Sequence, residues 1–358
     1  MIVYGSEHSY FTGKLEAYLR YKEIPYERRP AGVWMYSWKL PRLLGGAQLP
    51  TVQLADGRWM TDTTPMIAWL EEQHPAPEVI PTASPQRFAA LLLEDFGDEW
   101  LWRPAMHYRW SYPADRALLS RRLASELIRL PLPLALRRRW FARRQLRLFV
   151  IGDGVDARTR PHVEAAYTRV LDILEPVLAR RPFLLGGRPT IADIGLQGSM
   201  FRHFSLDPTP ARIMRDRAPS VYEWVARVWA ARASRIGDAP LLDGFPADLE
   251  PLLAETARTH LPMLAANATA FAAGRRSHDF TAAGATYRDV PTSRYRVWAL
   301  DRIRRALLGL EGADRATTDQ LLDRTGCLQP LLAAEPPPSG HDPGGHAPFS
   351  AVSRMVRD

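Results

Sequence analysis

The sequence predicts an α/β domain followed by an all-α domain and a further helical region. Residues 1–81 alternate short apolar β-type runs with helical spacing in the order β-α-β-α-β-β-α, which indicates a mixed sheet covered by helices. Residues 85–240 space their apolar positions as helices do, and further helical patterns follow in residues 245–332. Residues 333–358 are rich in Pro, Gly and Ser, which predicts a disordered tail.

The composition indicates a cytoplasmic protein without a disulfide framework. We find no run of eighteen apolar residues and no signal-peptide pattern, so we expect neither a transmembrane helix nor a cleaved leader. Cys327 is the only cysteine, which excludes an intramolecular disulfide and a cysteine-rich metal site. With 358 residues, the chain is long enough for two domains with cores of their own.

The excess of positive over negative charge lies in one segment. The formal net charge is +8, and the stretch from Arg116 to Arg147 holds ten arginines against one acidic residue, Glu126. The rest of the chain is therefore close to neutral, and we expect no nucleic-acid partner. Across residues 116–149 the arginines alternate with leucine and aromatic residues, which fits either a solvated face or peripheral contact with an anionic membrane.

The first elements of the α/β domain lie on either side of a short polar loop. Ile2–Tyr4 is a β-type run, and residues 14–22 follow the loop with helical spacing. A second strand begins at Ile24. A weaker helical pattern over residues 38–44 ends at Gly45-Gly46, as helices commonly do at glycine.

A β-hairpin is predicted next. Two short apolar runs, Thr51–Leu54 and Arg58–Thr61, flank Asp56-Gly57, which is a strong turn signal. Pro50 precedes the first run, and a peptide bond before proline can be cis. Asp62 lies just before a predicted helix N-terminus, where backbone N–H groups attract a carboxylate and Asp62 would attract an ammonium. The stretch therefore fits a pocket for a small zwitterion, although an ordinary capped hairpin fits the same residues.

The all-α domain carries two local signals of its own. Pro131 and Pro133 interrupt the arginine-rich stretch, which predicts at most two helices there. Thr190 followed three residues later by Asp193 predicts a capping box at a helix start.

Five motifs resemble those of the serine-type cytosolic glutathione transferases. They are the spacing Ser9…Lys14…Lys22, the run Lys22-Glu23-Ile24-Pro25-Tyr26-Glu27, the run Gln48-Leu49-Pro50-Thr51, the pair Asp62-Thr63, and Phe183-Leu184-Leu185-Gly186 followed by Thr190-Ile191-Ala192-Asp193. The resemblance spans residues 1–235. It implies a thioredoxin-like, glutathione-binding N-terminal domain (1–81) and the all-α C-terminal domain of this family (85–240), with the arginine-rich stretch as an insertion.

This resemblance implies a catalytic hydroxyl near the first strand. By register, Ser9 would donate a hydrogen bond to the glutathione sulfur, which favours the thiolate and lowers the pKa of the thiol. Ser6, Tyr4, Tyr10 and Thr12 are alternatives. The loop contains no cysteine, so we expect no chemistry through a mixed disulfide.

The resemblance also implies how glutathione binds. The backbone of Leu49, before a cis Pro50, would contact the cysteinyl part of glutathione. Thr63 would bind the γ-glutamyl carboxylate, Asp62 the ammonium, and Gln48 the peptide. Asp62 stands where relatives carry Glu or Gln, so its side chain reaches less far.

Two further groups of residues follow from the resemblance. Lys39 and Arg42 are candidates for the glycyl carboxylate. An aromatic group is expected near the cleft between the domains, where it would suit an apolar co-substrate. Its members are Trp100, Trp102, His107, Tyr108, Trp110 and Tyr112.

The implied function is that of a glutathione transferase-like enzyme with glutathione as co-substrate and no metal. The thiolate would attack an apolar or aromatic electrophile in conjugation, isomerisation, ether cleavage or peroxide reduction. The alternative is a non-catalytic binding protein, or a membrane-associated one, with the same fold. Relatives are usually homodimers, and we expect a homodimer unless residues 245–332 block the contact.

Overall fold

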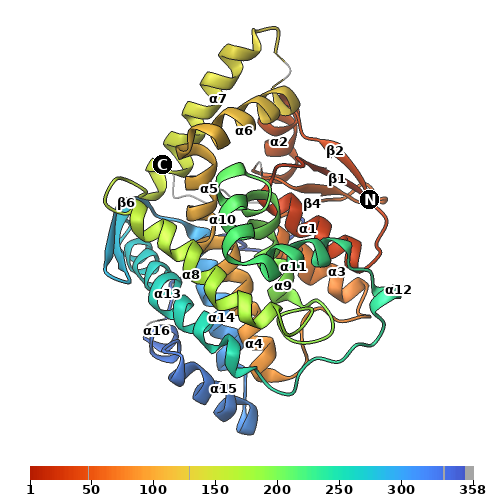
Figure 1. The fold of residues 1–358 in the computed structure, drawn as a ribbon, viewed down its shortest axis with the longest axis vertical. Coiled ribbons are helices and arrows are strands. Elements are labelled where there is room, and N and C mark those ends of the chain that lie inside the picture. Colours follow the sequence, from red (N-terminus) through yellow and green to blue (C-terminus); the bar gives the residue numbers. More distant parts are fainter. Residues whose placement is uncertain (47, 129, 334, 351–358) are drawn as a thin grey trace.

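The computed structural model describes residues 1–46, 48–128, 130–333 and 335–350 (Figure 1). In this view the α/β domain lies at the right and the C-terminal extension at the lower left, with the helical domain between them. This order of an α/β domain, an all-α domain and added C-terminal helices agrees with the predicted fold class.

The α/β domain is built on a four-stranded mixed sheet with the order β2-β1-β3-β4. Its strands are β1 (Ile2–Gly5), β2 (Glu27–Pro30), β3 (Thr51–Gln53) and β4 (Trp59–Thr61). Strand β1 pairs parallel with β2 and antiparallel with β3, and β3 and β4 form the predicted hairpin. Val3, Val52 and Met60 are fully buried, so one face of the sheet packs against the helices of the domain. These helices are α1 (Tyr10–Tyr21), η1 (Met35–Lys39), α2 (Leu40–Leu44) and α3 (Thr63–Gln73).

The helical domain begins with a long, kinked run. It consists of α4 (Ser84–Asp95), η2 (Phe96–Trp100) and α5 (Trp102–Ser111). The later helices are α8 (Arg160–Leu178), α9 (Ile191–Ser199), η4 (Met200–Phe204), α10 (Pro208–Arg217), α11 (Pro219–Ala230) and α12 (Ala233–Ile236). The predicted capping box is present, since Asp193 accepts hydrogen bonds from the backbone N–H and the hydroxyl of Thr190 at 2.9 and 3.0 Å.

The arginine-rich stretch forms the two helices that the prolines predict. They are α6 (Pro113–Leu127) and α7 (Leu134–Phe149), followed by a short turn of helix, η3 (Ile151–Asp153). Helix α7 projects from the top of the molecule in Figure 1, and Phe141 is its one fully buried side chain. Within the ranges described, none of the helices is both long and apolar enough to cross a bilayer.

The sequence pattern predicts a purely helical extension, and this prediction is wrong for one part of it. Between α13 (Glu250–Ala272) and α14 (Arg294–Leu308) it forms a two-stranded hairpin, β5 (Ser277–Ala282) and β6 (Ala285–Pro291). Ala283 and Gly284 make the turn with φ of 46° and 85°, as a two-residue hairpin turn requires. The remaining elements are η5 (Ala247–Leu249), α15 (Gly312–Arg324) and α16 (Leu328–Leu332).

Buried ion pairs join the extension to the other domains. Arg302 of α14 donates to Glu94 at 2.9 Å, and the same carboxylate accepts from Lys14 of α1 at 2.5 Å. His260 of α13 lies 2.6 Å from Asp95. Separating the three regions would leave these buried polar groups without their partners, which is costly, so the contacts fix how the regions pack together.

The tail returns to the α/β domain. Residues 335–350 contain no helix or strand, but the Thr61 N–H donates to the Pro348 carbonyl at 2.9 Å. The Phe349 ring meets Trp69 edge-on, with 5.4 Å between centroids. The predicted disorder therefore covers a segment that makes defined contacts here, and residues 351–358 lie outside the described residues.

Candidate active site

Five of the residues expected to bind glutathione line one small cavity. Gln48, Leu49, Pro50, Asp62 and Thr63 surround it, and Phe11 and Tyr295 complete its wall. Its volume is about 20 Å³, which is room for about one water molecule.

The backbone at this cavity has two special features. The Leu49–Pro50 peptide bond is cis, as predicted. Asp62 directly precedes α3 with φ 71°, a conformation that non-glycine residues rarely adopt. Such a residue costs about 1–3 kcal/mol and is typical of ligand sites. The first N–H groups of α3 lie beside Asp62 and Thr63, so this end of the cavity suits a carboxylate.

The extension and the tail cover the cavity. Tyr295 of α14 lies in its wall, and His341 Nε2 of the tail is 3.5 Å from Asp62 Oδ2. The tail also contacts the end of β4 through Thr61 and Pro348. Glutathione is much larger than this space, so its binding requires the tail or the Tyr295 side chain to move.

A second, larger cavity of about 330 Å³ lies between the α/β domain and helices α5 to α7. Phe11 and Leu49 line both cavities, so the two adjoin. The larger cavity also contains Ser9, and most of its wall is aromatic or aliphatic. The aromatic side chains around it are Tyr10, Phe11, Tyr36, Trp102, Trp110, Trp140, Phe141 and Phe149.

Ser9 has a hydroxyl proton that is uncommitted. It caps α1 by accepting a hydrogen bond from the Thr12 N–H at 3.4 Å, and in the described part of the chain it donates none. Ser6 also lines the larger cavity, but its hydroxyl donates to Glu126 at 2.7 Å. Thr12, another of the alternatives, also has a hydroxyl without a partner among the described residues, but it is fully buried and lines neither cavity. A hydroxyl that keeps its donor free can hydrogen-bond a thiolate.

The two tyrosine alternatives are committed elsewhere. The Tyr10 hydroxyl donates to the Gly97 carbonyl, and burial raises the pKa of Tyr10 well above its usual value. The Tyr4 hydroxyl donates to Gln53 at 3.4 Å, and its ring stacks on Trp59. Neither phenol is placed to activate a thiol in the larger cavity.

Sequence reasoning missed Arg109, the charged group next to the Ser9 loop. Its guanidinium lines the larger cavity, donates to the His8 carbonyl at 2.7 Å and forms a two-pronged ion pair with Asp207 at 2.7 and 2.9 Å. Burial, and then Arg109, lower the pKa of His8 to about 4, so His8 is neutral near pH 7. Arg109 lies within an aromatic stretch, and no spacing rule would have selected it.

Two of the expected residues lie away from both cavities. Lys39 Nζ lies over the Trp59 ring, 4.8 Å from its centroid, and Arg42 lies over Trp38 at 4.5 Å. Neither side chain lines the small or the larger cavity.

The aromatic group is divided between the cavity and the core. Trp102 and Trp110 line the larger cavity. Trp100 and Tyr108 are core residues, and His107 is buried 2.8 Å from Glu164. Burial lowers the pKa of His107, which indicates a structural histidine. The last member, Tyr112, donates to the same glutamate at 2.8 Å. In the part of the chain that the structure describes, no three His, Cys, Asp or Glu side chains gather as metal ligands would.

Comparison with known families identifies both domains. Residues 8–73 match the glutathione S-transferase N-terminal domain, and residues 143–231 match the glutathione S-transferase C-terminal domain. The chain therefore carries both the N-terminal and the C-terminal domain of the glutathione S-transferase superfamily. No curated protein sequence matches it.

Solved structures of similar fold come from several organisms. A glutathione S-transferase from Rhodospirillum rubrum F11 shares 22% identity over 71% of this chain and 92% of its own, with a TM-score of 0.43. The beta-etherase LigF from Sphingobium sp. strain SYK-6 shares 16% identity over 63% of this chain and 93% of its own, with a TM-score of 0.45. A maleyl pyruvate isomerase, a bacterial glutathione S-transferase of the Zeta class, shares 19% identity over 64% of this chain and 96% of its own, with a TM-score of 0.36.

Proposed function

We propose that the protein binds glutathione in the small cavity and activates its thiol through Ser9 for attack on an apolar or aromatic electrophile. One observation carries the proposal. Gln48, Leu49, Pro50, Asp62 and Thr63 meet at a single cavity, and that cavity adjoins a larger apolar one that contains a free serine hydroxyl.

The thiol is expected to ionise at this junction. The Ser9 hydroxyl donates to the sulfur, which favours the thiolate. Arg109 lines the same cavity, but its charge is compensated by the ion pair with Asp207. In a conjugation reaction the thiolate forms the new carbon–sulfur bond while the leaving group departs with the electron pair. The proton of the thiol passes to solvent. Isomerisation, ether cleavage and peroxide reduction use the same activated sulfur.

Glutathione is expected to be held by its γ-glutamyl end. The carboxylate binds the first N–H groups of α3 and the Thr63 hydroxyl, where the helix dipole favours negative charge. The ammonium binds Asp62, whose Oδ2 accepts no hydrogen bond from the described residues. Lys39, the expected partner of the glycyl carboxylate, lies over the Trp59 ring in this structure.

The covered state of the small cavity favours the second candidate function, a glutathione transferase fold without catalysis. The residues that line the small cavity, Tyr295 among them, leave about 20 Å³, and His341 of the tail lies against Asp62, so the site is too small for glutathione in this conformation. An enzyme that uses glutathione must therefore open the small cavity. A non-catalytic protein that binds a membrane or another partner elsewhere on its surface need not open it.

Turnover with serine variants tests the enzyme proposal. The rate of glutathione conjugation to chlorodinitrobenzene is measured against pH for wild type, Ser9→Ala, Ser9→Thr and Ser6→Ala. We expect the conjugation rate of Ser9→Ala to be at least tenfold lower than that of wild type and to rise only at higher pH, where the thiol ionises unaided. Ser9→Thr should recover part of the rate, and Ser6→Ala should stay near wild type. Equal rates in Ser9→Ala and wild type would exclude Ser9 as the activating group.

The expected homodimer is also a proposal. Helices α14 and α15 of the extension pack against α4, so part of the helical-domain surface is already covered by the same chain. Light scattering coupled to size-exclusion chromatography measures the mass directly. Twice the mass of one chain supports the dimer, and a single-chain mass would show that the extension blocks it.

A further inference from the structure

Exposed apolar side chains are concentrated at one end of the molecule. Of the fifteen large apolar or aromatic side chains exposed among the described residues, eleven lie in segments 33–43 and 130–151. Trp34, Leu136 and Trp140 are 67%, 57% and 59% exposed. We call these two segments the apolar rim. A surface this rich in tryptophan and leucine is unusual for a side that faces only water.

The two parts of the apolar rim face each other across the larger cavity. Val33 and Tyr36 line it from one side, and Trp140 lines it from α7 on the other. Figure 1 shows α7 and α2 at the same, upper end of the molecule. The mouth of the larger cavity therefore opens within the rim.

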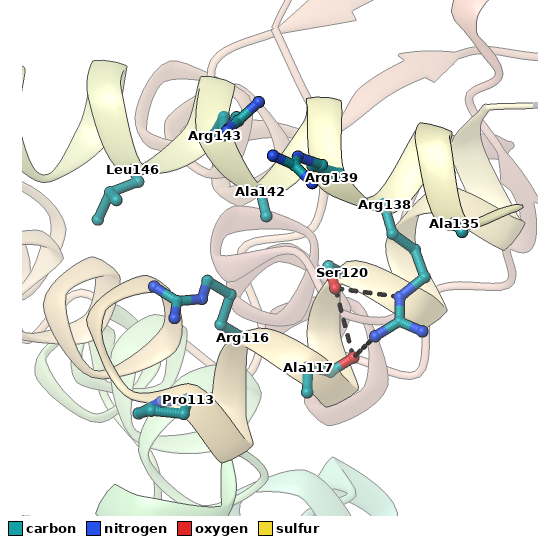
Figure 2. Close-up of a pocket in the computed structure, with 10 residues that line it drawn as sticks. All are labelled: Pro113, Arg116, Ala117, Ser120, Ala135, Arg138, Arg139, Ala142, Arg143 and Leu146. Carbon is teal, nitrogen blue, oxygen red and sulfur yellow. Dashed lines mark hydrogen bonds between the residues drawn. The ribbon is translucent and has the colours of Figure 1, made fainter.

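The same end carries positive charge for which the described residues supply no carboxylate partner. Segments 31–46 and 127–152 contain no Asp or Glu, whereas α7 alone has six arginines. A groove of about 620 Å³ runs between α6 and α7 and is lined by Arg116, Arg138, Arg139 and Arg143, with no carboxylate in its wall (Figure 2). Arg138 donates to the Ala117 carbonyl at 3.1 Å and to the Ser120 hydroxyl at 3.4 Å, and Ser120 donates to the same carbonyl at 3.3 Å (Figure 2).

We propose that the apolar rim and the arginines of α7 form a surface that binds an anionic lipid bilayer. Exposed tryptophan and leucine insert at the headgroup level, and arginines attract anionic headgroups, so a bilayer satisfies both features at once. A nucleic acid would use the arginines but leave most of the leucines in water. Helix α7 is too polar to span a bilayer, so it would lie along the membrane surface.

This surface gives the larger cavity an entrance from the lipid. If the cavity takes an apolar electrophile, which rests on the proposed function, that electrophile reaches it from the bilayer, where such molecules concentrate. Membrane binding itself rests only on the rim and the arginines.

Vesicle co-sedimentation of the full chain tests the surface. The vesicles are phosphatidylcholine with or without phosphatidylglycerol. We expect binding to the anionic vesicles that weakens with added salt, because screening reduces the attraction. Each arginine near such a surface contributes about fivefold, so Arg139→Glu/Arg143→Glu should reduce partitioning at least tenfold.

Matched variants separate the rim from a general loss of folding. Trp34→Ser/Leu136→Ser should weaken vesicle binding, whereas Leu206→Ser/Leu308→Ser, which alters exposed side chains elsewhere, should not. Arg212→Glu/Arg235→Glu is the corresponding charge control and should also bind as wild type. Circular dichroism confirms that each variant is folded.

The outcomes separate this proposal from the proposed function. Vesicle binding that is absent, or equally affected by the rim and control variants, would overturn the surface proposal. Equal binding to neutral vesicles, unaffected by salt, would show that anionic headgroups are not required. Binding to RNA but not to vesicles would show that the partner is a nucleic acid instead of a bilayer. Vesicle binding without turnover would support the surface while the enzyme proposal fails.

Discussion

Removal of the tail should strengthen glutathione binding. A chain that ends at residue 334 lacks His341, Pro348 and Phe349, which cover the small cavity and the adjacent end of β4. While the tail is docked, the apparent affinity for glutathione is reduced by the fraction of molecules in the open state. The measured effect of truncation therefore reports how firmly the tail docks.

The size of this effect follows from the tail contacts. The hydrogen bond from Thr61 contributes about 1 kcal/mol. The edge-to-face contact of Phe349 with Trp69 adds about 0.5–1.5 kcal/mol, and Arg58 over the Phe349 ring adds about 0.5–1 kcal/mol. Ordering the tail opposes part of this sum. We expect a net of at least about 1.4 kcal/mol, which is tenfold in the dissociation constant.

Isothermal titration of glutathione into both chains measures the difference. A chain that ends at residue 350 is the matched control and should bind as wild type, because the described contacts come from residues before that point. Phe349→Ala should give an intermediate affinity. An unchanged dissociation constant after truncation at 334, or a weaker one, would refute the reasoning.

Three further predictions concern stability and domain integrity. Lys14→Met leaves Asp98 buried without its cation and leaves Glu94 with Arg302 as its remaining cation, so it should lower the free energy of unfolding by about 3–5 kcal/mol in urea titrations; a loss under 1 kcal/mol would contradict this. Burial lowers the pKa of His203 well below its usual value and that of His8 to about 4. As the pH falls below about 6.5, these two histidines bind protons in the unfolded chain but not in the folded one, so the folded state loses stability. Each histidine should then cost about 1.4 kcal/mol per pH unit, and thermal melts at pH 7.5 and 5.5 that do not differ would disprove it. A chain that ends at residue 245 should aggregate, since it exposes the apolar surface under α13 and α14; a folded monomer of that length would show that the extension is dispensable.

Local signals carried the prediction of elements in both the α/β domain and the helical domain. Asp56-Gly57 fixed the β3–β4 hairpin, and the Thr190–Asp193 box fixed the start of α9, because turn and cap chemistry act over a few residues. The proline before β3 and the helix that follows Asp62 then bring the expected binding residues together, since the hairpin and α3 are adjacent in sequence.

Long-range contacts account for what the sequence did not reveal. The β5–β6 hairpin turns at Ala283-Gly284, which lacks the Asn-Gly or Asp-Gly signal, although His278, Phe280 and Ala282 alternate as a half-buried strand does. Closure of the small cavity depends on Tyr295, more than two hundred residues from Thr63, and on the tail beyond it. Packing of distant segments sets such contacts, and no local pattern encodes them.

Glutathione binding at the end of α3 tests the central claim most directly. Glutathione is titrated into wild type, Thr63→Ala and Asp62→Asn, each with and without the tail, and Thr269→Ala, an exposed threonine on α13, is the control. The account predicts binding that both site variants weaken about tenfold or more while Thr269→Ala leaves it unchanged. No binding heat at millimolar glutathione, even without the tail, would contradict it.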